Sequence, residues 1–231
     1  MYEEALEDYT KALEIEPSHF KSYFNRAFCY DILGSYKKSL EDYFECLKLK
    51  PDNVRTLHHI GSVYEKISTN KALKNSIIFF LKALKIDPNY APSYNGLGLV
   101  YDAMNNREKA LRNFDKALLI APKNAVFLQN KACCLRRMGN LEEGLNYFRK
   151  ALTYDPENTQ ILSNLGYKKY SFNFFRAILR KMGKYEEAIE AYTEEIDYSP
   201  DNAKALNNRA FCLAKLGMYD QAVMDYSLVL E

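Results

Sequence analysis

The feature that most constrains the fold of this chain is a proline that returns at a nearly fixed interval. Six prolines share this spacing, namely Pro17, Pro51, Pro88, Pro122, Pro156 and Pro200. The intervals between them are 34, 37, 34, 34 and 44 residues, and each proline closes a similar phrase, such as YEEALEDYTKALEIEP at residues 2–17. A period of roughly 20 to 50 residues indicates stacked supersecondary units, because one such unit cannot bury its apolar face alone.

The pattern within each period predicts two helices. Before each proline a small residue, an aromatic residue and a second small residue recur at i, i+4 and i+7, as in Ala110, Phe114 and Ala117. This spacing places the three side chains on one face of a helix. An earlier helix carries a small residue where two helices must approach closely; these residues are Ala27, Gly61, Gly98, Ala132, Gly166 and Ala210. Glu195 is an exception, since it stands where a small residue is expected.

Glycines punctuate the turn between the two helices, where a positive φ costs glycine little; they are Gly34, Gly139, Gly183 and Gly217. A 34-residue helix–turn–helix with these small, aromatic and proline positions resembles the tetratricopeptide repeat (TPR) family. The resemblance covers essentially the whole chain. It implies an all-α fold, a right-handed superhelical solenoid of antiparallel helix pairs.

We expect a single array over residues 1–231. Its units are a partial repeat at 1–19, repeats at 20–53, 54–90, 91–124, 125–158 and 159–202, and a partial repeat at 203–231. Because repeat arrays normally end in a polar capping helix and neither end has one, we expect the chain to be a piece of a longer array.

Two units depart from the period. The unit at 54–90 has three extra residues near KISTNKALK, which we expect to lengthen its turn. The unit at 159–202 has an insertion, placed at residues 167–176 (YKKYSFNFFR). Three interpretations of the insertion stay open: an exposed aromatic docking segment, a long first helix whose aromatic side chains pack internally, and an artefact such as a retained short intron.

Composition excludes several classes of function. The net charge is +2, which indicates neither nucleic acid nor a membrane surface as a partner. No apolar run approaches the roughly 20 residues of a membrane helix. The five cysteines lie in helical patterns without a CxxC pair, which favours reduced thiols over disulfides or metal binding. We therefore predict a cytoplasmic protein, with association with the cytoskeleton or a large assembly left open.

The chain shows no pattern of an enzyme. Its three histidines lack partner residues at metal-binding spacing, and it has no glycine-rich phosphate loop. We predict no catalytic residue, no metal and no cofactor. The resemblance implies a non-catalytic scaffold that binds an extended peptide or partner segment in a concave groove. Two other functions stay open: the substrate-recognition arm of a larger enzyme, and an architectural element of a large assembly.

The resemblance implies that the first helix of each unit lines the groove. Two residues before the small packing position stand Asn25, Asn130, Asn164 and Asn208, a series that His59 and Gly96 interrupt. An amide side chain can donate to and accept from any peptide unit, so these residues could form a ladder along a bound peptide; alternatively, they bond to neighbouring backbone. We predict as further groove residues Lys21, Phe24, Phe28, Arg55, His58 and Phe211. We expect Asp31, Glu65 and Asp102 to offset the charges of Lys21 and Arg55.

A second mechanism in the family grips the C-terminal carboxylate of chaperone tails. It uses Lys and Asn one turn apart on one first helix, and Lys and Arg on the first helix two units further on. The corresponding pairs in this chain are Phe24 and Phe28, His58 and Ser62, and Gln129 and Cys133. We therefore predict that this clamp is absent.

Overall fold

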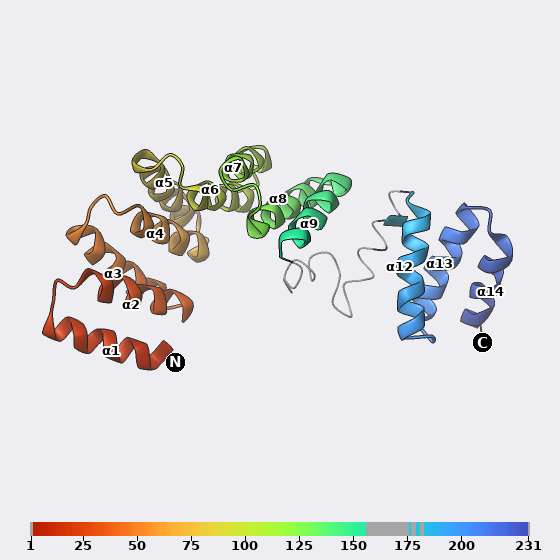
Figure 1. Cartoon of the computed structure of the whole chain (residues 1–231), viewed down its shortest axis with the longest axis horizontal. Helices are drawn as coiled ribbons and strands as arrows, with labels where there is room; N and C mark the ends of the chain where they lie inside the picture. The colour runs from red at the N-terminus through yellow and green to blue at the C-terminus, as the bar shows by residue number, and fades with distance from the viewer. Residues whose placement is uncertain (1, 156–175, 177–178, 181–182, 231) are drawn as a thin grey trace. The chain divides into compact units, whose positions relative to one another are not determined.

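The computed structural model describes residues 2–155, 176, 179–180 and 183–230, and the regular elements within these ranges are α-helices (Figure 1). The first eight are α1 (Tyr2–Ile15), α2 (Phe20–Ile32), α3 (Tyr36–Leu49), α4 (Val54–Ile67), α5 (Asn70–Ile86), α6 (Ala91–Ala103), α7 (Arg107–Ile120) and α8 (Ala125–Met138). The later ones are α9 (Leu141–Tyr154), α12 (Tyr185–Tyr198), α13 (Ala203–Lys215) and α14 (Tyr219–Leu230). Within the described residues the fold is all-α, as predicted, and is built from successive packed helix pairs.

Contacts between Cα atoms divide the chain into two compact units, Met1–Cys134 and Leu135–Glu231. In the first unit α2 packs on α3, α4 on α5, and α6 on α7; in the second unit α13 packs on both α12 and α14. The domain organisation as one array over residues 1–231 stays a prediction.

The repeated proline and asparagine set the ends of the helices. The helices α3, α5, α7 and α12 each end two residues before a repeat proline, because the residue that precedes a proline is disfavoured in the helical region. The asparagine two residues after that proline caps the next helix: Asn53 Oδ1 accepts from Thr56 N at 2.9 Å, and Asn202 Oδ1 accepts from Ala205 N at 3.1 Å. Such caps satisfy backbone donors that the helix leaves free.

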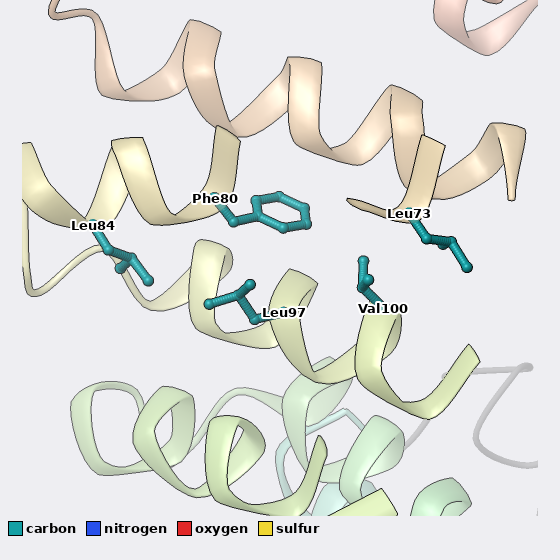
Figure 2. Packing of buried hydrophobic residues seen from close by; sticks show 5 residues of the cluster. All are labelled: Leu73, Phe80, Leu84, Leu97 and Val100. Atoms are coloured by element: carbon teal, nitrogen blue, oxygen red, sulfur yellow. The ribbon is translucent and has the colours of Figure 1, made fainter. Parts of the chain in front are cut away.

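The predicted close approach of helices is visible around Phe80 of α5. Its ring packs with Leu73 and Leu84 of the same helix and with Leu97 and Val100 of α6 (Figure 2). A Cβ added at Gly96 would lie 2.4 Å from Phe80 Cζ, closer than real contacts allow. The missing side chain therefore provides the space that the ring occupies.

The turn glycines adopt a positive φ, as predicted, and in two repeats another residue takes the glycine position. Gly34 and Gly139 have φ of +74° and +87°. In the units between them the left-handed position is taken by Ser68 (φ 57°) and Asn105 (φ 60°). Positive φ is unfavourable for serine, so the geometry of this turn overrides residue preference.

The prediction that three extra residues lengthen the turn of the 54–90 unit was wrong. The connection between α4 and α5 is only Ser68 and Thr69, and the extra residues lie in α5, which has 17 residues against 14 in α3. Thr69 caps α5 by accepting from Ala72 N, and Ala72 and Leu73 are buried. The added turn has its own cap and its own apolar contacts, which explains why it is helical.

Residues 167–175 of the predicted insertion lie outside the described residues, as does Asn164. Arg176, the last residue of that insertion, is buried and forms an ion pair with Glu195. Glu195 also accepts a hydrogen bond from Asn202 Nδ2 at 2.9 Å. The exception that Glu195 makes to the small-residue pattern thus has a physical reason, since a buried cation offsets its charge and an amide bonds to one of its two oxygens.

Candidate functional site

A pocket of about 630 Å³ lies in the first unit, beside the starts of α2 and α4. Its lining residues are Glu16, Ser18, His19, Phe20, Lys21, Phe24, Asn25, Lys50, Asn53 and Arg55. Four of the predicted groove residues, Lys21, Phe24, Asn25 and Arg55, therefore share one pocket. Lys21 and Arg55 occupy the same position of two successive first helices, whereas Phe24 and Asn25 lie one turn further along α2.

Two aromatic rings hold cations over the pocket. Lys50 Nζ lies 4.7 Å from the centroid of the Phe20 ring, and Arg55 Cζ lies 5.7 Å from that of Phe24. The two rings stack on each other with centroids 6.1 Å apart. A cation over an aromatic face is attracted by the ring quadrupole, so both cations are favoured at the pocket even when it is empty.

His59, which interrupts the asparagine series, packs against Phe24 and two other aromatic rings. Its ring centroid lies 5.2 Å from that of Phe24, 6.1 Å from that of Phe28 and 5.5 Å from that of Tyr43. Burial lowers the pKa of His59 to about 4. Its imidazole is therefore neutral at pH 7 and contributes packing rather than charge.

His58 packs against α5 and the start of α6. Its ring lies 5.4 Å from the rings of both Phe80 and Tyr90, and Nδ1 lies 3.2 Å from Ser93 Oγ. Burial, and then the neighbouring His59, lower its pKa to about 3. This environment leaves His58 as a neutral packing residue beside the first helices, and its role as a groove residue stays a prediction.

The described members of the asparagine series have three different environments. Asn25 is exposed and lines the pocket. Asn130 Nδ2 donates to Asn95 Oδ1 of α6 at 2.9 Å. In the second unit, Asn208 Nδ2 donates to the Lys204 carbonyl of its own helix at 2.8 Å. Asn130 and Asn208 thus each use one amide hydrogen in a bond within the protein, whereas the side-chain donors and acceptor of Asn25 form no such bond.

Phe211, the remaining predicted groove residue, lies on α13 in the second unit. Its ring contacts that of Tyr185 at 6.5 Å, and Arg180 Cζ and Lys215 Nζ lie 4.9 Å and 5.5 Å from its centroid. Phe211 therefore repeats the combination of aromatic ring and cation that the pocket of the first unit shows.

Of the three acids expected to offset the charges of Lys21 and Arg55, Asp31 and Asp102 lie against other cations, and the balance of charge that includes Glu65 stays a prediction. Asp31 binds Lys66 Nζ at 2.7 Å, and Asp102 approaches Arg107 at 3.9 Å. Within the described residues, Lys21 and Arg55 form no ion pair with a carboxylate. The two aspartates are engaged elsewhere, so the positive charge at the pocket is not balanced by them.

Sequence reasoning missed Phe20, Lys50 and Asn53 as pocket residues. They lie at the ends of helices and in the connector, where the pattern was interpreted only as punctuation. Among the described residues, no group of three His, Cys, Asp or Glu side chains could hold a metal ion. No helix in the same part of the chain is long and apolar enough to cross a lipid bilayer.

Comparisons with known proteins agree with the repeat geometry. Models of the tetratricopeptide repeat match residues 1–19, 20–53, 91–124 and 125–158, and a TPR repeat model matches residues 177–217, which together cover more than half of the chain. The chain belongs to the tetratricopeptide repeat family. TPR repeats bind protein partners and are typically non-catalytic, so this TPR protein is in general terms a protein-interaction scaffold.

Solved structures of similar fold come from several bacteria. The TPR chain resembles pilF of Pseudomonas aeruginosa with a TM-score of 0.65 and 20% identity, covering 86% of this chain and 85% of that one. It resembles TTC0263, a thermophilic TPR protein of Thermus thermophilus, with a TM-score of 0.63 and 23% identity over 69% and 86% of the two chains. It resembles MamA from Desulfovibrio magneticus with a TM-score of 0.57 and 22% identity, covering 68% of this chain and 87% of that one. No protein of curated function matches the sequence.

Proposed function

We propose that this TPR protein binds an extended segment of a partner protein along the first helices of the unit Met1–Cys134, and that the pocket beside α2 and α4 anchors it. The observation that supports this most is the gathering of Lys21, Phe24, Asn25 and Arg55 around one pocket of about 630 Å³. Polar, aromatic and cationic groups that converge on a concave site are typical of binding sites.

Asn25 is the member of the asparagine series with the most to offer such a segment. It is exposed, and no described residue bonds to its amide, so both its donor and its acceptor are available to a peptide unit. Each hydrogen bond of this kind contributes about 1 kcal/mol net. Asn130 contributes less to the proposed ladder, because one of its amide hydrogens already bonds to Asn95.

The proposed partner is a protein, not a nucleic acid or a membrane. The supporting observations are the small net charge of +2 and the mixture of rings, amides and cations at the pocket. A cytoplasmic location belongs to the same proposal. It is supported by the buried thiols of Cys46 and Cys212, whose pKa values burial raises to about 12 and about 11, which is typical of structural cysteines.

Selection from a displayed library of extended 16-residue peptides tests the proposal. Peptides that bind the full chain should bind Asn25→Ala about five- to thirtyfold more weakly, because one or two hydrogen bonds of about 1 kcal/mol are lost. The control is Asn113→Ala, which removes an asparagine of α7 outside the pocket. Failure to select any peptide, or selection of peptides that bind both variants equally, would exclude the proposed site.

A further inference from the structure

We propose that the pocket beside α2 and α4 is a carboxylate site that takes adjacent Asp or Glu side chains from within the partner segment. This inference rests on the proposed function and adds the chemistry of the partner to it.

The charges at the pocket are not matched by the protein. Three cationic side chains line it, those of Lys21, Lys50 and Arg55, against the single carboxylate of Glu16. Within the described residues none of the three cations forms an ion pair. Three cations on one pocket of about 630 Å³ raise the local concentration of anions there.

Three other basic residues in the same unit are paired with acids across helix interfaces. Arg26 Nε lies 2.7 Å from Asp42, Lys66 Nζ lies 2.7 Å from Asp31, and Lys131 Nζ lies 2.6 Å from Asp115. The chain therefore supplies paired carboxylates at these interfaces, whereas at the pocket it supplies only Glu16, which forms no ion pair with the three cations. What sets the pocket apart is that three such cations converge on it with one carboxylate.

Two of the cations stand where they disfavour the fold. Lys21 and Arg55 are the second residues of α2 and α4, and neither helix has an acid in its first turn. Cations near a helix N-terminus are unfavourable because they face the positive end of the helix dipole. The first turns of α9 and α12 carry the favourable choice, a pair of glutamates. The helix dipole therefore does not account for a cation at either position, whereas an anion bound at the pocket would.

The pocket is also prepared to donate hydrogen bonds to carboxylates. Phe20 and Phe24 hold Lys50 and Arg55 by cation–π contacts. The Oδ1 atom of Asn53 is occupied, because it accepts from Thr56 N and from Thr56 Oγ1, both at 2.9 Å. The amide NH₂ group of Asn53 is what remains for a ligand, and it adds a donor to those of the cations.

An internal acidic run fits these groups better than a chain terminus. Three cations can neutralise two or more carboxylates, whereas a terminus brings one. The site is distinct from a carboxylate clamp, since Phe24 and Phe28 hold the clamp positions on α2.

Fluorescence titration of the full chain with a labelled twelve-residue peptide tests the inference. The probe is acetylated and amidated and carries four central Glu in a Gly-Ser context; the comparison probes carry four Gln instead, either amidated or with a free C-terminus. We expect the Glu probe to bind at least tenfold more tightly than either Gln probe. We expect binding to weaken when salt is raised from 50 to 300 mM, because exposed ion pairs are screened.

Variants then assign the binding to the pocket. Lys21→Gln with Arg55→Gln should weaken the Glu probe about tenfold, since two exposed ion pairs are lost. The melting temperature should stay the same or rise, because two cations leave helix N-termini. The matched control is Lys74→Gln with Arg112→Gln, which removes one exposed Lys and one exposed Arg of the same unit, both outside the pocket and beyond the first turn of their helices.

Equal loss in the control, equal binding of the Glu and Gln probes, absence of Glu-probe binding, or preference for the free terminus would each overturn the inference. Peptides selected by the library but indifferent to these substitutions would leave the proposed function standing while removing the carboxylate site. A library that yields no peptide would instead remove the proposed function.

Discussion

At the scale of single residues, small side chains determine how closely the helices pack. Ala110 and Ala117 of α7 are fully buried beside Phe114, and the Phe114 ring fills the space that a Cβ of Gly98 would need. The same exchange of volume occurs between Phe80 and Gly61. Because interiors are packed to crystal-like density, these positions tolerate little added volume and no unpaired charge.

The substitution Ala110→Glu tests this packing. Ala110 is fully buried and clusters with Phe114 and Cys134, so the new carboxylate would lose water without gaining a partner. We expect a loss of about 3–5 kcal/mol in the free energy of unfolding, measured by urea denaturation. The same change at exposed Ala103 should cost less than about 1 kcal/mol. Similar midpoints for both variants would show that the helical register is incorrect.

The buried histidines predict a dependence of stability on pH. Burial lowers the pKa of His58 to about 3 and of His59 to about 4, whereas both titrate near 6.5 when unfolded. The unfolded state therefore binds more protons below pH 6.5. Stability should fall as the pH drops from about 6.5 toward 4, by at most about 1.4 kcal/mol per pH unit for each histidine. Below about pH 3 these two groups add no further loss.

Denaturation series between pH 4 and 7 measure this slope. His59→Phe should flatten it, because Phe24, Phe28 and Tyr43 surround the ring with aromatic surface that a phenyl group can replace. An unchanged slope in His59→Phe would mean that His59 is protonated in the folded state.

At the scale of helices, an arginine links three consecutive elements at two places in the chain. Arg26 of α2 binds both carboxylate oxygens of Asp42 on α3 at 2.7 and 2.8 Å and Thr10 of α1 at 3.1 Å. The same geometry returns 183 residues later with Arg209, which binds Asp225 of α14 and Thr193 of α12. A planar guanidinium suits such bidentate pairing. The spacing of 16 residues on either side of the arginine can be found in the sequence, but the structure is needed to show that the three side chains are in contact.

A double-mutant cycle on Arg26 and Asp42 measures this link. Asp42→Leu alone should cost about 2–4 kcal/mol, because it leaves a largely buried guanidinium without its partner. Arg26→Met with Asp42→Leu should recover about half of that or more, since neither charge then remains. The coupling is obtained from the unfolding free energies of the four proteins. Additive single effects would mean that the pair contributes nothing beyond each residue alone.

The helices could be predicted from the sequence, but the pocket could not, because helices follow a local period and the pocket depends on contacts between distant residues. Helical faces follow a local period, so Phe114 and Ala117 could be assigned to the core from their spacing alone. The pairing of Asp31 with Lys66 joins residues 35 positions apart, and no local pattern tells which of several acids a lysine will meet. The pocket was missed in part for the same reason, because Lys50 and Asn53 reach it from a connector.

At the scale of the whole molecule, stability should vary along the array, because each repeat contacts only its neighbours. Ile60 and Val63 of α4 are fully buried between neighbouring helices. On α14 the exposed fractions of Val223 and Met224 are 62% and 69%, and on α1 that of Ile15 is 86%. The helices with less buried apolar surface should open locally more often than the others.

Amide hydrogen exchange followed by mass spectrometry tests this gradient. Peptides from α1 and α14 should exchange at least about tenfold faster than those from α4 to α7, which corresponds to about 1.4 kcal/mol of local stability. Phe80→Ala should remove about 3–5 kcal/mol and speed exchange throughout α4, α5 and α6, because the ring contacts Gly61 on one side and Leu97 and Val100 on the other. Met224→Ala should leave the pattern unchanged, since its side chain is mostly exposed. Uniform protection along the chain would show that the repeats unfold as one cooperative block. An effect of Phe80→Ala confined to α5 would show that the helices unfold independently. Either result would contradict an array in which neighbouring repeats stabilise one another.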